Sequence, residues 1–119
     1  MAKELEPSFT YPAKVMNIVD GDTYDLMIDL GHDVHVAARI RLLGVDTPET
    51  RTKDLEEKRL GLEAKQRVID LHLNEVTVRT VKKDSFGRWL ADLQFRRGGM
   101  TVDLAEFLIL NQLAKPVAR

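Results

Sequence analysis

The chain has 119 residues, 18 of them basic and 19 acidic, and contains no cysteine. That length suits one compact domain with its own core. The lack of cysteine excludes disulfides, thiolate zinc sites and cysteine nucleophiles, so any metal would need oxygen ligands or histidine. Oxygen ligands favour hard cations such as calcium or magnesium. Because the net charge is -1, binding of a polyanion would depend on locally clustered arginines and a bound cation.

The first part of the chain predicts a flexible arm followed by a three-stranded meander. Residues 1–10 are polar and form the expected arm, and residues 11–119 form the single expected domain. Asp20-Gly21 is a hairpin-turn signal between the first two strands. Apolar residues alternate with polar ones over three segments and predict strands there: 13–19, about 24–28 and 34–43.

The second part predicts a helix, two strands and a short final helix. The polar run 51–59 is interpreted as a mobile loop, and a helix is expected at about 62–73, with Ala64, Val68 and Leu71 on one face. Asp103 can cap the last helix, with Glu106 three residues on. Strands are expected around 76–78 and 89–95, separated by a turn at 84–87. This order fits an α+β, mainly β fold, namely a five-stranded OB-type barrel with two helices, although periodicity leaves other small α+β arrangements open.

Acidic and basic residues beside turn signals suggest phosphodiester chemistry. A hard cation neutralises phosphate charge and binds the attacking water, and Asp22 and Asp46 are candidate carboxylate ligands. Glu49 lies three residues beyond Asp46 and could accept a proton from that water. Arg41 and Arg88 could bind phosphate oxygens as planar forks and stabilise the charge of the transition state.

Each segment also has a purely structural interpretation. Asp20-Gly21-Asp22 alone is more simply a hairpin turn, and Thr47-Pro48 is a possible helix start. The segment 84–88 is a possible tight turn with a solvated arginine. Arg41 is harder to explain structurally, because an arginine between apolar neighbours must face solvent or find a buried anion.

Taken together, these segments resemble the staphylococcal nuclease (thermonuclease) family over about residues 11–115. The residues that carry the resemblance are Asp22, Asp46, Thr47-Pro48-Glu49 and Gly87-Arg88, within an order that includes the long segment 41–50. The long segment is far more specific than a single glycine pattern, although a motif is a hypothesis until its structural context is known.

The resemblance implies an OB-type barrel whose active site lies at one end. It implies calcium bound by Asp22, Asp46 and the backbone carbonyl of Thr47, with Glu49 as the base or orienting group. Arg41 and Arg88 would contact the scissile phosphate. The implied activity is hydrolysis of DNA and RNA that leaves 3′-phosphates, with little sequence specificity.

The chain also departs from the family pattern. Ser85 and Phe86 stand where family nucleases often have lysine and tyrosine, and the family's third helix and nucleotide-packing tyrosines are missing. We therefore expect weaker substrate binding rather than lost chemistry. Phe86 could stack on a base or support the turn through a core contact, and these alternatives are about equal.

Two alternatives concern partners and location. A catalytically silent module on the same barrel could bind nucleic acid or a protein, and the apolar last helix could either pack on the barrel or pair two subunits into a homodimer. The three histidines show no metal spacing and are expected to face solvent.

No segment approaches the roughly 20 apolar residues of a membrane span, and no secretory signal is visible. We therefore expect a cytoplasmic protein, or a secreted one if a signal has been removed.

Overall fold

Alternating apolar residues build the long meander that the sequence predicts. The computed structural model describes residues 2–118, and its first three strands pair antiparallel in chain order. They are β1 (Thr10–Asp20), β2 (Thr23–Gly31) and β3 (Val34–Leu42). The hairpin turn lies where Asp20-Gly21 predicts it. β1 begins at Thr10, within the segment expected to be an arm, because Thr10 already pairs with Arg79.

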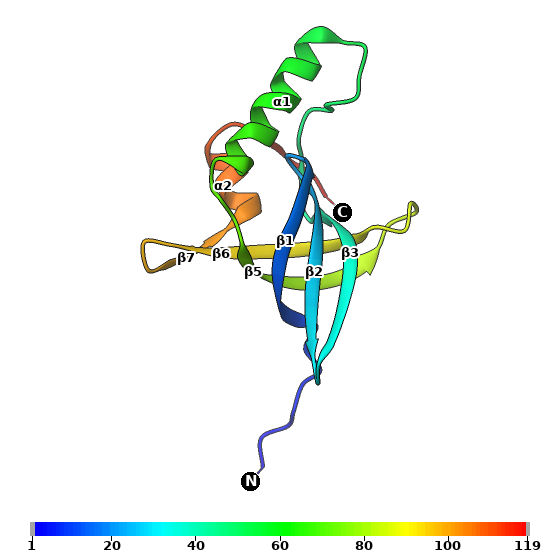
Figure 1. Cartoon of the computed structure of the whole chain (residues 1–119), viewed down its shortest axis with the longest axis vertical. Helices are drawn as coiled ribbons and strands as arrows, with labels where there is room; N and C mark the ends of the chain where they lie inside the picture. The colour runs from blue at the N-terminus through cyan, green and yellow to red at the C-terminus, as the bar shows by residue number, and fades with distance from the viewer. Residues whose placement is uncertain (1, 119) are drawn as a thin grey trace.

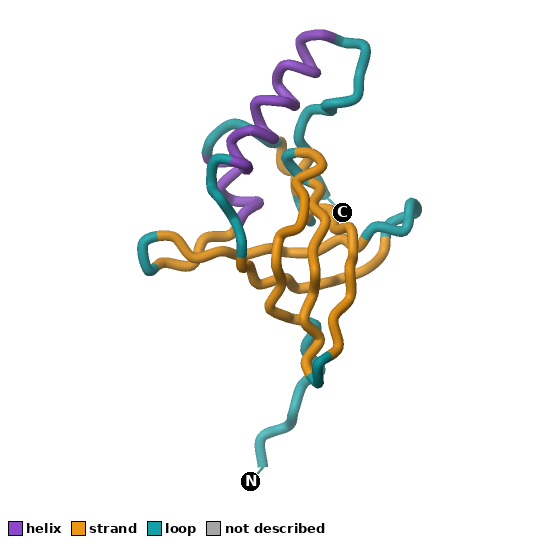
Figure 2. The backbone as a smooth tube through the Cα atoms, viewed as in Figure 1, coloured by secondary structure: helices purple, strands orange, loops and turns teal. Residues whose placement is uncertain are grey.

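Two later strands close this meander into a barrel (Figures 1 and 2). β5 (Glu75–Lys83) pairs with β1, and β6 (Trp89–Arg97) pairs with β5, both antiparallel. β3 then pairs in parallel with β6 and completes the ring, which removes the open sheet edges of a flat arrangement. The predicted five-stranded OB-type barrel is therefore confirmed. Three shorter strands were not predicted, since two to four residues carry no periodic signal: β4 (Val45–Asp46), β7 (Met100–Asp103) and β8 (Lys115–Pro116).

The first helix lies earlier in the chain than the sequence predicted. α1 spans Leu55–Ile69, so the predicted range of 62–73 and the loop at 51–59 are both wrong in part. The Asp54 carboxylate accepts hydrogen bonds from the backbone N–H groups of Glu56 and Glu57 and begins the helix there. The first turns are rich in glutamate, lysine and arginine, which are good helix formers but leave no apolar pattern.

The second helix packs on the barrel, as the simpler interpretation predicts. α2 (Leu104–Leu110) begins after Asp103, whose side chain accepts the N–H of Glu106. Leu104 and Leu108 are fully buried in the core, while Leu110 remains 73% exposed. Both helices of the described residues lie toward one end of the barrel, with α1 projecting beyond it (Figure 1).

Apolar side chains from the barrel and both helices share one core. Ala64 and Val68 of α1 are buried as predicted, whereas Leu71 lies beyond the helix end and is only partly buried. His32, His35 and His72 all face solvent, which confirms that prediction. Within residues 2–118, no helix is both long and apolar enough to cross a membrane.

Candidate functional site

Asp22 lies in the turn between β1 and β2, and it is 5% exposed. Its carboxylate accepts hydrogen bonds from the Thr23 hydroxyl (3.1 Å) and from the backbone N–H of Thr47 (3.2 Å). Gly21 is required beside it, because a Cβ at that position would lie 2.9 Å from the Thr47 methyl group. The turn therefore holds a carboxylate directly against the segment that carries Asp46 and Glu49.

Arg41, which lies between two apolar residues on β3, forms ion pairs with Asp22 and Asp46. Ile40 and Leu42 are fully buried, so alternation along β3 directs Arg41 away from the core. Its Nη2 lies 2.8 Å from Asp46 Oδ1 and 3.6 Å from Asp22 Oδ2. Among the described side chains, Arg41 Nε and Thr47 Oγ1 are buried polar atoms without a hydrogen-bond partner. Such atoms are costly, and a bound water, ion or ligand can satisfy them.

The loop that carries Glu49 packs against α1. A Cβ at Gly61 would lie 2.6 Å from the carbonyl oxygens of both Pro48 and Glu49, so only glycine permits this approach. The backbone N–H of Glu49 also donates to Glu57 Oε1 at 3.4 Å. No local pattern in the sequence singles out Gly61, because the close approach depends on tertiary packing.

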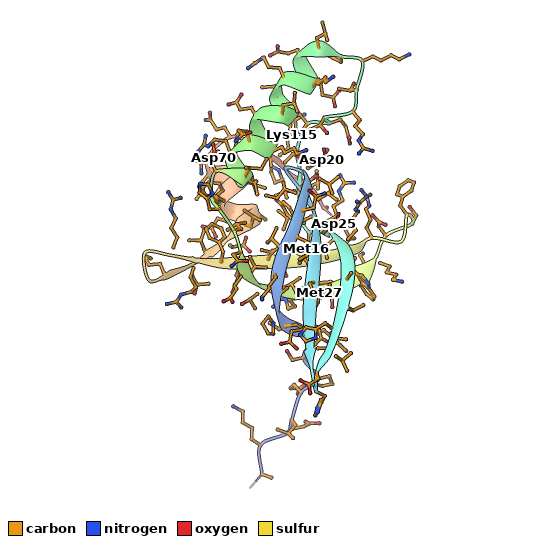
Figure 3. All side chains as sticks on the ribbon, in the orientation of Figure 1. Met16, Asp20, Asp25, Met27, Asp70 and Lys115 are labelled. Atoms are coloured by element: carbon orange, nitrogen blue, oxygen red, sulfur yellow. The ribbon has the colours of Figure 1, made fainter. Side chains whose placement is uncertain are left out.

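Glu49 lies among several charges although it remains open to solvent. Its partial burial and the negative charges of Asp20 and Asp22 raise the pKa of Glu49, while the nearby Arg41 acts in the opposite direction. Asp20 ends β1 (Figure 3) and accepts a hydrogen bond from the Thr50 hydroxyl. Asp20 was considered only as a turn residue, yet its spacing of two from Asp22 across Gly21 could have suggested that both serve the same end of the barrel.

Arg88 is fixed by the turn that precedes β6. The Asp84 carboxylate accepts the backbone N–H groups of Phe86 (2.9 Å) and Arg88 (3.0 Å), and also Arg88 Nε at 2.8 Å. Burial opposes ionisation of Asp84, but these bonds outweigh it and lower the pKa of that carboxyl group. Phe86 is 82% exposed, so the proposed core contact is wrong. Its ring centroid lies 5.4 Å from Arg88 Cζ, a cation–π arrangement.

Two hollows of opposite charge meet at Glu49. The first, here called the arginine hollow, is lined by Arg39, Arg41, Glu49, Phe86, Gly87 and Arg88. The second, here called the acidic groove, has a volume of about 510 Å³ and lies between α1 and the segment 112–115. The acidic groove contains one lysine, Lys115, and six carboxylate residues: Asp46, Glu49, Asp54, Glu56, Glu57 and Glu63.

Asp22 and Asp46 are the residues at this end of the barrel that could offer carboxylate oxygens to a hard divalent cation. Asp22 and Asp46 both approach Arg41, and Asp20 adds a third negative charge near Glu49. Within residues 2–118, no group of three or more histidine, aspartate or glutamate side chains is placed to hold a metal by itself. Two carboxylates would therefore need backbone oxygen and water to complete the shell, as is common for hard cations.

A closed OB-type barrel with acids and arginines at one end defines a small domain suited to an anionic, phosphate-bearing ligand. The sequence model of the staphylococcal nuclease homologue family matches residues 39–118, and the chain belongs to this family. That range includes Arg41, Asp46, Glu49 and Arg88 but begins after Asp22. A search of curated proteins found no match to the chain.

Proposed function

We propose that this protein is a nuclease that hydrolyses DNA and RNA with a divalent cation, most favourably calcium. Membership of the staphylococcal nuclease family supports a nuclease-type or nucleic-acid-binding function. The observation that carries the enzymatic proposal is the Asp22–Arg41–Asp46 ion-pair network, which lies beside Glu49 and whose Arg41 lines the arginine hollow together with Arg88.

Asp22, Asp46 and the Thr47 carbonyl are the proposed ligands of the cation. When bound there, a divalent cation would neutralise phosphate charge and lower the pKa of water. Asp22 is already oriented by Thr23 and Thr47, so its carboxylate would need little rearrangement. The choice of calcium follows from the family resemblance.

Arg41 and Arg88 would bind the non-bridging oxygens of the scissile phosphate. Both side chains are mostly buried, 16% and 24% exposed, and both are held by aspartates. Asp84 bonds the Nε of Arg88 and so fixes the plane of its guanidinium. A prearranged fork of this kind stabilises the negative charge that develops in the transition state.

Glu49 would take a proton from the attacking water. The raised pKa of Glu49 supports this role, because a base works best when its pKa approaches the working pH. The new P–O bond forms as the P–O5′ bond breaks, and the leaving oxygen receives a proton. The products are a 3′-phosphate and a 5′-hydroxyl, with little sequence specificity because the proposed groups contact the backbone.

Cleavage of labelled single-stranded DNA and RNA tests the proposal. The protein is assayed with calcium, with magnesium and with a chelator, beside Asp46→Asn and the control Asp92→Asn. Asp92 is also an aspartate paired with an arginine, but it lies on β6 opposite Arg79. We expect cleavage with calcium, none with chelator, and a loss of about a hundredfold in Asp46→Asn only.

Two results would contradict the nuclease proposal. Equal rates for Asp46→Asn and Asp92→Asn would show that the network is not the active site. Binding of the oligonucleotides without cleavage under any divalent cation would instead support a catalytically silent binding module of the same family.

A further inference from the structure

Arg39 lines the arginine hollow beside Arg41, but neither the proposed catalytic steps nor the proposed metal site uses it. Ile40 lies between them and is fully buried, so alternation places both arginines on the outer side of β3. Residues two apart on a strand are separated by roughly 6.6 Å. That separation is comparable to the distance between successive phosphates of an extended single strand.

Asp25 fixes the orientation of Arg39. The two residues lie directly opposite each other on β2 and β3, and Arg39 Nε and Nη2 contact the two carboxylate oxygens at 2.8 and 3.1 Å. An arginine has five N–H donors, and this pair engages only one edge of the guanidinium. The Arg39 side chain is 52% exposed, so solvent or a ligand can reach it.

We propose that Arg39 is a subsite for the backbone phosphate one nucleotide away from the cleaved bond. The nucleic-acid strand would pass along β3, with one phosphate bound by Arg41 and Arg88 and the neighbouring phosphate bound by Arg39. The acidic groove on the other side of Glu49 would repel the nucleic acid. The nucleic-acid strand would therefore extend from Arg41 toward Arg39. The subsite rests on the proposed function, since the cleaved bond defines its position.

Arg79 offers a matched control for Arg39. It also lies on a strand directly opposite an aspartate, Asp92, and its side chain is 64% exposed. Arg79 does not line the arginine hollow. The variants Arg39→Gln and Arg79→Gln therefore each remove one charge and one exposed ion pair, but only the first removes the proposed phosphate contact.

Binding of a fluorescent single-stranded oligonucleotide, measured by anisotropy with chelator over a series of salt concentrations, tests the proposal without cleavage. We expect Arg39→Gln to weaken binding roughly tenfold at low salt and to make the log–log salt dependence shallower by about 0.7, as loss of one phosphate contact does. Arg79→Gln should bind like the unmodified protein. Arg39→Lys, which keeps the charge, should retain the salt dependence.

The outcomes separate this subsite from the nuclease proposal. Equal binding by Arg39→Gln and Arg79→Gln, or no binding by the unmodified protein, overturns the subsite even if cleavage occurs. Selective loss in Arg39→Gln, with both variants folded by circular dichroism, supports a phosphate contact at Arg39. If no divalent cation then produces cleavage, the nuclease proposal fails, and Arg39 is a phosphate contact of a binding module whose position is not defined by a cleaved bond.

Discussion

The arginine hollow and the acidic groove share Glu49 but differ in charge and in construction. Strand β3 and the turn before β6 supply the first, whereas α1 and the segment 112–115 supply the second. The arginine-lined side of Glu49 is more favourable for an anion than the carboxylate-lined side. The net charge of -1 conceals this division, so the local arrangement of charges, and not their sum, indicates where an anion can bind.

Three carboxylates of the acidic groove already form contacts within the fold. Asp54 caps α1, Glu57 accepts the Thr52 hydroxyl, and Glu56 pairs with Arg59 on the exposed helix surface. In the arginine hollow, by contrast, Arg41 contains a buried Nε that has no partner among the described residues. Several carboxylates of the groove are thus engaged within the fold, whereas the hollow contains a buried donor that a ligand could engage.

Of the three substitutions considered next, removal of Arg88 should have the largest effect. We expect Arg88→Ala to slow cleavage by about a hundredfold or more, because a group that stabilises transition-state charge is lost. Arg97→Ala is the control, since Arg97 is exposed at the far end of β6, the strand that begins just after Arg88. Initial rates with saturating oligonucleotide measure the effect. Similar losses of rate in both variants would show that cleavage does not depend specifically on the arginine hollow.

Gly61→Ala tests whether α1 positions Glu49. Glycine to alanine in a helix normally stabilises by about 0.5–1 kcal/mol, but here the new Cβ meets two backbone carbonyls. We expect a loss of about 1–3 kcal/mol in the free energy of unfolding and a fall in kcat. Denaturant titration and steady-state kinetics measure these, with Leu62→Ala as the neighbouring exposed control. A more stable Gly61→Ala variant with unchanged kcat would rule out this positioning.

Phe86→Ala should leave kcat and the free energy of unfolding nearly unchanged and should change binding only. Because Phe86 is 82% exposed, the free energy of unfolding should change by less than about 0.5 kcal/mol. Loss of a stacking face should weaken single-strand binding by about 1–3 kcal/mol. Anisotropy titrations measure this against Met100→Ala, another exposed apolar side chain. Unchanged binding would show that Phe86 does not contribute a stacking face to single-strand binding.

The barrel was predictable because its strands alternate regularly and its turns carry clear signals. Asp20-Gly21 marked the first hairpin, and Asp103 marked the start of α2. The start of α1 was missed because its first turns show no apolar periodicity, so capping by Asp54 decides the boundary. The short strands β4 and β8 depend on pairing between distant segments, which no local pattern reveals.

The candidate site was predictable only as a set of residue types. Asp22, Arg41 and Asp46 do meet, and Glu49 lies among the same charges. Asp20, Gly61 and Arg39 were not selected, because their importance follows from approaches between segments that lie far apart in the sequence. For Phe86 the sequence left a core contact and a stacking face equally open, and its exposure excludes the core contact.

Glu49 and Glu63 permit the most direct test of the central claim, that Glu49 faces an active arginine hollow. Glu49 lines both hollows, whereas Glu63 lines only the acidic groove and pairs at its surface with Arg59. Each substitution to glutamine removes one negative charge. In the calcium-dependent cleavage assay, we predict a loss of about a hundredfold or more for Glu49→Gln and a rate close to that of the unmodified protein for Glu63→Gln. Equal rates for the two variants would contradict the account.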